Sequence, residues 1–252
     1  MQRQHIPALG PRYWVALCLA SIFGANSGDF FAHDIGLGHV AGLPFLAIAL
    51  VAVLFVERLD NAVHEVYYWA AIVIVRTAAT NFADFFSGDL RLAKIWVITV
   101  LTFLLMLAVR LSWRFLWSAK GYKDGDQSGL IRADWAYWTC MFVAGTLGTV
   151  IGDFCSHDWR LGDGWAAILL STALFALFLA KRNLLLWSLP FHWLIIVMIR
   201  AAGTVVGDFF AGRNMLGLSL STLVTGLLFI GLLIMWKEPF AERQDPSVAT
   251  KG

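Results

Sequence analysis

The sequence predicts an all-α membrane protein whose eight transmembrane helices form four tandem helical hairpins, grouped into two pseudo-symmetric halves. Two observations predict this fold class: an apolar composition and an internal repeat. Of the 252 residues, 59% are hydrophobic and 14% are charged, and the mean hydropathy is +0.71. A soluble domain carries about 25% charged residues. The composition therefore places most of the chain inside a bilayer.

Apolar segments follow one another along the whole chain, and most are near the roughly 20 residues with which a helix crosses a bilayer. They comprise residues 14–28, 40–56, 66–86, 95–109, 135–151, 165–180, 193–207 and 216–236. We do not interpret the first segment as a signal peptide, because it carries the first copy of the repeated motif and cleavage would destroy that copy. The segments predict a polytopic protein with little mass outside the membrane.

A short motif with a central aspartate recurs four times, as "ANSGDFFAH", "TNFADFFSG", "TVIGDFCSH" and "TVVGDFFAG". The four aspartates are Asp29, Asp84, Asp153 and Asp208. A tryptophan lies fifteen residues before each of them, and it follows a tyrosine or histidine: Tyr13-Trp14, Tyr68-Trp69, Tyr137-Trp138 and His192-Trp193. A leucine lies eight residues after each: Leu37, Leu92, Leu161 and Leu216. One repeat is therefore predicted to be a helix that ends at the motif, a short loop and a return helix.

The spacing of the aspartates divides the chain into two halves. Successive aspartates are 55, 69 and 55 residues apart, so the halves are offset by 124 residues. The longer gap holds residues 118–134, the only long polar stretch. We expect residues 1–117 to form the first half, 118–134 a cytoplasmic linker, 135–236 the second half, and 237–252 a flexible cytoplasmic tail.

This pattern resembles a bacterial family of membrane proteins known by its repeat of unknown function. The resemblance extends from Tyr13 to Trp236. It implies four tandem repeats, each with two membrane helices and a characteristic tryptophan, in a prokaryotic protein. The family has no established activity, so the resemblance concerns architecture and origin only.

Charge predicts the orientation of the chain. With two helices in each repeat, the motif loops face one side, and the termini and inter-repeat loops face the other. The second side carries thirteen Lys and Arg residues and the motif side carries four. The positive-inside rule then places both termini in the cytoplasm of a bacterium, with the protein spanning the inner membrane several times.

The repeated aspartates are the first candidate site. Tryptophans are typical anchors at membrane interfaces, and fifteen helical residues rise about 22 Å, so the aspartates should lie in the outer part of the membrane. Carboxylates at that depth need water, a partner or the bundle interior. We therefore expect a shared polar vestibule, to which Asn26 and Asn81, three residues before the first two aspartates, also belong. The alternative is structural: each carboxylate accepts hydrogen bonds from backbone amides where its helix ends.

Two His-Asp pairs lie beyond the first and third aspartates. They are His33-Asp34 and His157-Asp158. Imidazole and carboxylate ligands suit first-row divalent metals, so the two pairs are candidates for a metal site at the outer mouth. The alternative is that both pairs are solvated loop residues.

Arg76 and Arg200 lie at equivalent positions of the two halves, each eight residues before a motif aspartate. Each follows a repeat tryptophan by seven residues, which is about 10 Å along a helix and near the middle of the membrane. We expect them to act alike, as an electrostatic barrier below the aspartates. The alternative is that their side chains extend toward the cytoplasmic interface.

These features favour a transporter or channel for a small cation, either a divalent metal ion or one coupled to protons. A redox protein that binds haem or a metal through His33 and His157 is the first alternative, since haem needs only one or two axial ligands. A membrane scaffold without transport activity is the second. No catalytic motif and no nucleic-acid-binding patch occurs, so an enzyme is less expected. The expected partners are membrane lipid and the cation, and the oligomeric state stays open.

Overall fold

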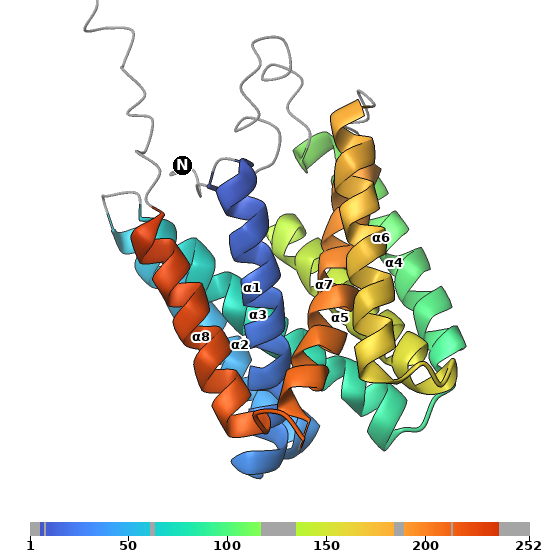
Figure 1. The fold of residues 1–252 in the computed structure, drawn as a ribbon. Helices are drawn as coiled ribbons and strands as arrows, with labels where there is room; N and C mark the ends of the chain where they lie inside the picture. Colours follow the sequence, from blue (N-terminus) through green and yellow to red (C-terminus); the bar gives the residue numbers. More distant parts are fainter. Residues whose placement is uncertain are drawn as a thin grey trace, which may run out of the picture.

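A computed structural model describes residues 6–7, 9–60, 64–116, 135–183, 189–212 and 214–236. These residues form eight α-helices (Figure 1): α1 Pro11–Asp29, α2 Gly38–Leu59, α3 Glu65–Asp84, α4 Lys94–Leu116, α5 Trp135–Asp153, α6 Gly162–Asn183, α7 Leu189–Ala211 and α8 Leu218–Met235. The all-α prediction is therefore confirmed for this part of the chain. The expected linker at 118–134 and the expected tail at 237–252 lie outside the described residues.

The inner layer consists of the four motif helices. α1 packs against α3, α3 against α5, α5 against α7, and α7 back against α1, so these helices form a closed ring. The other four helices surround the ring. Each packs mainly on the inner helix that follows it in the chain, α2 on α3, α4 on α5 and α6 on α7, and α8 packs on α1. The outer helices therefore contact the inner helix of a neighbouring repeat, and the last helix, α8, contacts the first, α1.

Aromatic residues mark the contacts of the inner ring at the end opposite the motifs. Tyr13 lies 5.8 Å from Trp69 between ring centroids, and Tyr68 lies 5.8 Å from Trp138. The series continues with Tyr137 on Trp193 at 5.7 Å and closes with His192 on Trp14 at 5.7 Å. All four tryptophans are buried. The expectation that they face the membrane interface as anchors is therefore wrong, because each stacks within the protein on the ring of a neighbouring helix.

Glycines allow the inner helices to approach closely beside the two arginines. A Cβ added at Gly148 would lie 2.5 Å from Arg200 Cβ and 2.6 Å from the carbonyl oxygen of Val197. A Cβ at Gly24 would meet Arg76 Cβ and its backbone in the same way. Small residues at helix crossings are typical of membrane bundles, where packing rather than hydrophobicity holds helices together.

The motif helices do not end in a simple loop, as the sequence predicted. After Asp29, Asp84 and Asp153 the chain continues through one π-helical turn: η1 Phe30–Asp34, η2 Phe85–Asp89 and η5 Phe154–Asp158. The repeated leucine then closes the turn at three of the four motifs. Leu37, Leu92 and Leu216 each donate their backbone N–H to the carbonyl of the second residue after the aspartate, at 3.1–3.3 Å.

Seven helices in the described residues are long and apolar enough to cross a membrane. The chain therefore has the character of a multi-pass membrane protein. The remaining helix, α3, packs between α1, α2 and α5 and carries the buried polar residues Arg76, Thr80 and Asn81. Because α3 faces protein on most sides, its hydropathy need not match that of a lipid-facing helix.

Candidate functional site

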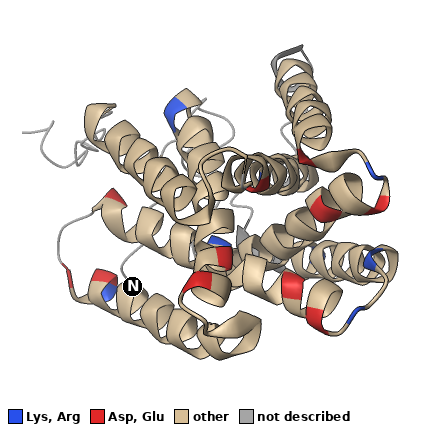
Figure 2. Ribbon diagram, turned by 60° about the horizontal axis from the view of Figure 1, so that its bottom comes forward, with Lys and Arg blue, Asp and Glu red and all other residues tan. Residues whose placement is uncertain are grey.

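The four motif aspartates line one cavity of about 510 Å³ between the ends of the inner helices. Asp29, Asp84, Asp153 and Asp208 are each half-buried, at the motif end of α1, α3, α5 and α7. Figure 2 brings this end forward and shows acidic residues on several of the surrounding helix ends. We call this space the aspartate cavity.

The carboxylates of the aspartate cavity have no hydrogen-bond partner among the described protein atoms. At the turns after Asp29, Asp84 and Asp153, none of the three makes a side-chain capping bond. The amides that follow are satisfied by backbone carbonyls; the N–H of Phe30, for example, bonds to the carbonyls of Asn26 and Ser27. The structural alternative, in which the carboxylate caps the turn, therefore does not describe these three sites.

Threonines form the next layer below the carboxylates. Thr80, Thr149 and Thr204 each lie four residues before an aspartate and line the same cavity. We call them the threonine collar. Residues four apart lie on one face of a helix, so the collar and the aspartates share the inner face of the ring. The first repeat has Ala25 at this position.

Arg200 is fully buried and lies directly under the threonine collar. Its Nε donates to Thr149 Oγ1 at 2.8 Å, and its Nη2 donates to Thr80 Oγ1. Its Nη1 donates to the carbonyl oxygen of Ser21 at 2.9 Å. The guanidinium is thus held by three neutral acceptors from three different helices, and two of them, Thr80 and Thr149, line the aspartate cavity.

Arg76 points the other way, although it occupies the equivalent position of the first half. Its Nη2 lies 3.7 Å from the sulfur of Met141, and its Nε and Nη1 have no hydrogen-bond partner in the described residues. Its electrostatic neighbours are Tyr13, Tyr68 and Tyr137, together with Cys18. The two arginines, expected to act alike, therefore have different surroundings in the structure, because their side chains contact different residues.

Sequence differences between the halves account for this divergence. Arg200 reaches upward to the hydroxyl of Thr149, whose counterpart 124 residues earlier is Ala25 and offers no acceptor. The first-half arginine instead reaches downward to Met141, whose counterpart is Leu17. Since a buried guanidinium seeks acceptors for its five N–H donors, each arginine turns toward the side where a neighbouring helix supplies one.

The bundle axis is sealed below the arginines. One aliphatic residue from each inner helix lies four positions further down, namely Leu17, Ile72, Met141 and Ile196, and all four are fully buried. Beneath them the hydroxyl groups of Tyr13, Tyr68 and Tyr137 meet, with Tyr68 2.9 Å from Tyr13 and 2.6 Å from Tyr137. Among the described residues, these two layers fill the centre of the bundle between the arginines and the end opposite the motifs.

The His-Asp pairs lie at the mouth, but their members are separated. His33 and His157 line the aspartate cavity, together with His39 and Lys94. Asp34 instead accepts a hydrogen bond from Ser219 Oγ at 2.5 Å. Asp158 pairs with Lys94 Nζ at 2.6 Å. No group of three or more His, Cys, Asp or Glu side chains is placed to hold a metal ion anywhere in the described ranges, so the four predicted metal ligands do not form one cluster.

The two asparagines are buried beside the cavity rather than in its lining. Asn26 donates from Nδ2 to Ser221 Oγ at 2.7 Å, which joins α1 to α8. Neither polar atom of the Asn81 side chain has a hydrogen-bond partner in the described part of the chain, and its Nδ2 faces Gly42 on α2. Both residues therefore lie at contacts between an inner and an outer helix, and the structure does not place them in the vestibule.

Several lining residues escaped the sequence-based prediction. The threonine collar could have been found by stepping four residues back from each aspartate, which gives threonine in three repeats out of four. Lys94 could not have been found in this way, because it belongs to α4 and reaches across to the carbonyl oxygen of Asp153 at 3.3 Å. Only the packing of α4 on α5 brings it to the mouth.

Comparison with known proteins identifies a repeat. Two stretches of the chain match the model of one repeat family. The family is described as a repeat of unknown function (DUF347), and the matches cover residues 12–59 and 191–238. The first stretch spans α1, its motif turn and α2, and the second spans nearly all of α7 and all of α8. No curated protein and no solved structure matches the chain.

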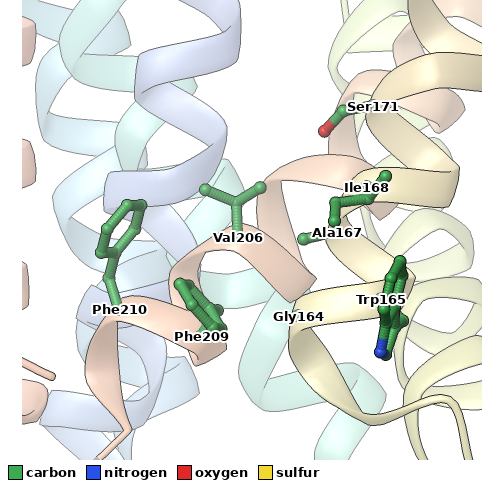
Figure 3. A pocket seen from close by; sticks show the side chains of 8 residues that line it. All are labelled: Gly164, Trp165, Ala167, Ile168, Ser171, Val206, Phe209 and Phe210. Atoms are coloured by element: carbon green, nitrogen blue, oxygen red, sulfur yellow. The ribbon is translucent and has the colours of Figure 1, made fainter. Parts of the chain in front are cut away.

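A second hollow lies on the outer surface between α6 and α7 (Figure 3). It is lined by Gly164, Trp165, Ala167, Ile168, Ser171, Val206, Phe209 and Phe210. Its lining holds no titratable side chain, and Phe209 and Phe210 directly follow Asp208 in the motif. The hollow faces outward, away from the axis on which the aspartates converge.

Proposed function

We propose that the protein is a bacterial inner-membrane transporter or channel for a small cation, and that the aspartate cavity is its binding site. The observation that carries this proposal is the convergence of four repeated carboxylates on one cavity within a membrane bundle, where none of them has a hydrogen-bond partner in the described part of the chain. Four carboxylates around one cavity attract a cation strongly where the dielectric constant is low. Intramembrane acidic groups that face a cavity are typical of ion pathways.

The spacing of the ligands favours a hydrated cation. Among the described residues, no three acidic or histidine side chains are close enough together to enclose one metal ion. A cation of the cavity would therefore keep part of its water shell, and the carboxylates would bind it through that water. Mg²⁺ and Mn²⁺ commonly bind with retained water and oxygen ligands, so we propose a divalent ion of this kind or a proton-coupled ion as cargo.

We further propose that the chain consists of four repeats in two pseudo-symmetric halves. Two of the four proposed repeats match the family model. They are the repeat formed by α1 and α2 and the repeat formed by α7 and α8. The other two are supported by recurring contacts of the same kind, such as Tyr68 on Trp138 between α3 and α5. The close approach of Gly24 to Arg76 and of Gly148 to Arg200 supports the correspondence of the halves.

Removal of single charges from the aspartate cavity is expected to weaken cation binding. Asp29→Asn, Asp84→Asn, Asp153→Asn and Asp208→Asn keep the shape of the side chain and remove its charge. We expect each to lower the affinity for Mn²⁺ about tenfold or more, because charge attraction in a partly desolvated cavity is worth a few kcal/mol. The measurement is equilibrium binding of Mn²⁺ to purified protein, with thermal stability recorded in parallel.

Glu57→Gln is the matched control, because Glu57 is a half-buried acid on α2 near the opposite end of the bundle. This variant should bind Mn²⁺ like the wild type. Unchanged binding in all four aspartate variants would refute the proposal. A Soret band in the absorption spectrum of the purified protein would instead favour the haem alternative, in which His33 and His157 serve as ligands.

The proposed orientation gives a separate expectation. A reporter fused after Gly252, or inserted within residues 118–134, should be cytoplasmic, and one inserted beside His39 should be periplasmic. The reason is the excess of Lys and Arg on the side of the termini. Opposite locations of the two cytoplasmic reporters would contradict a chain built from four hairpins of the same orientation.

A further inference from the structure

We propose that Arg200 is the resident counter-cation of the aspartate cavity, and that its charge determines how strongly the cavity discriminates between monovalent and divalent cations. The inference rests on the proposed function, since it concerns the same cavity. It assigns different roles to two arginines that the sequence makes equivalent. Arg200 acts on the cation, whereas Arg76 does not.

The first support is the position of the Arg200 guanidinium. It is fully buried, and two of its hydrogen-bond acceptors, Thr80 Oγ1 and Thr149 Oγ1, belong to residues that line the cavity. All three of its acceptors are neutral, so hydrogen bonding orients the guanidinium without cancelling its charge. No acidic side chain in the described residues forms an ion pair with it at contact distance. The nearest opposite charges are those of the cavity itself.

The second support is the set of charged groups with which the Arg200 guanidinium interacts. Arg200 interacts electrostatically with Asp29, Asp84 and Asp208, and also with Asp153. It is also repelled by the like charge of Arg76. The corresponding neighbours of Arg76 are three tyrosines and a cysteine, with no aspartate among them. Two arginines at the same depth of one bundle thus provide a test position and its internal control.

A fixed positive charge beneath four carboxylates has a definite effect on bound cations. It repels any cation that enters, and the repulsion energy is proportional to the charge of that cation. Arg200 therefore weakens divalent binding more than monovalent binding. A site of moderate affinity also suits transport, because an ion has to leave as well as enter.

The experiment compares Arg200→Gln with the wild type and measures equilibrium binding of Mn²⁺ and Rb⁺ to purified full-length protein. Glutamine removes the charge and keeps N–H donors for the threonine collar. If the affinity for Rb⁺ rises about tenfold, that for Mn²⁺ should rise about a hundredfold, because doubling the charge doubles the Coulomb energy and squares the ratio of affinities. Arg200→Lys, which keeps the charge, should not show the larger gain for Mn²⁺ than for Rb⁺.

Arg76→Gln is the comparison variant. It should raise both affinities much less than Arg200→Gln does, because no aspartate is among the groups with which Arg76 interacts. Equal gains for Rb⁺ and Mn²⁺, no gain in a folded Arg200→Gln protein, or the same gain in Arg76→Gln would each overturn the assignment. If the aspartate variants lose binding while Arg200→Gln stays unchanged, the inference fails and the proposed function stands. If neither the wild type nor Arg200→Gln binds either ion, both fail.

Discussion

Replacing Trp193 by alanine is expected to destabilise the protein by about 3–5 kcal/mol, the usual range for removing a large aromatic side chain from a packed core. Trp193 is only 2% exposed. Its ring lies 5.7 Å from that of Tyr137 and 5.5 Å from that of His192. Its Nε1 has no hydrogen-bond partner among the described atoms, so the loss would be one of packing. The loss of stability is measured by thermal unfolding of the purified protein in detergent. The yield of monodisperse protein is a second measure of it.

Trp165→Ala provides the comparison for this prediction. Trp165 lies in the first turn of the outer helix α6, is 70% exposed and lines the apolar hollow on the outer surface (Figure 3). Its removal should change stability by about 0.5 kcal/mol or less, as for most surface substitutions. Equal losses in the two variants would show that the repeated tryptophan is an ordinary lipid-facing residue rather than a contact between inner helices.

The fold class could be predicted from the sequence because its signals are local. The length and hydropathy of apolar segments depend only on neighbouring residues, and they gave helices close to those observed. The segment predicted at 135–151, for example, lies within α5, Trp135–Asp153. The main error concerned the motif turns, where Phe30–Asp34 continues as a π-helical turn. A π-turn differs from a loop only in its hydrogen bonds, and composition does not reveal those.

The periodicity of the sequence could not predict which helices pack against one another. Nothing in a hairpin repeat indicates that α2 packs on α3, or that the outer helix α8 packs on α1. The role of the tryptophans was misjudged for this reason. Trp69 has the typical position of an interface anchor in its segment, but it stacks on Tyr13 of another helix.

The candidate site, too, could be predicted only in part from the sequence. The sequence predicted a shared position for the four aspartates, because equal spacing on repeated helices brings equivalent residues to equal depth. It could not predict the opposite directions of Arg76 and Arg200, which depend on single acceptors such as Thr149 and Met141 on other helices. Nor could it show that Asp34 binds Ser219 and that Asp158 binds Lys94. The sequence had instead suggested that both aspartates join His33 and His157 in one metal site.

Neutralising the whole aspartate cavity is expected to have the largest functional effect. The quadruple variant Asp29→Asn, Asp84→Asn, Asp153→Asn and Asp208→Asn removes all four carboxylates from the cavity and leaves Arg200 as an uncompensated positive charge beneath it. Cations would then be repelled where they are now attracted. Thermal stability serves as the control for folding, because loss of the carboxylates leaves the buried Arg200 without nearby opposite charges and costs some stability.

Flux of Mn²⁺ into liposomes containing the purified protein tests the central claim most directly, with an encapsulated Mn²⁺-sensitive dye as the reporter. The wild type should accelerate dye quenching well above the rate of empty liposomes, Glu57→Gln should match the wild type, and the quadruple variant should fall to the rate of empty liposomes. A folded quadruple variant that carries Mn²⁺ at the wild-type rate would contradict the claim that cations pass through the aspartate cavity.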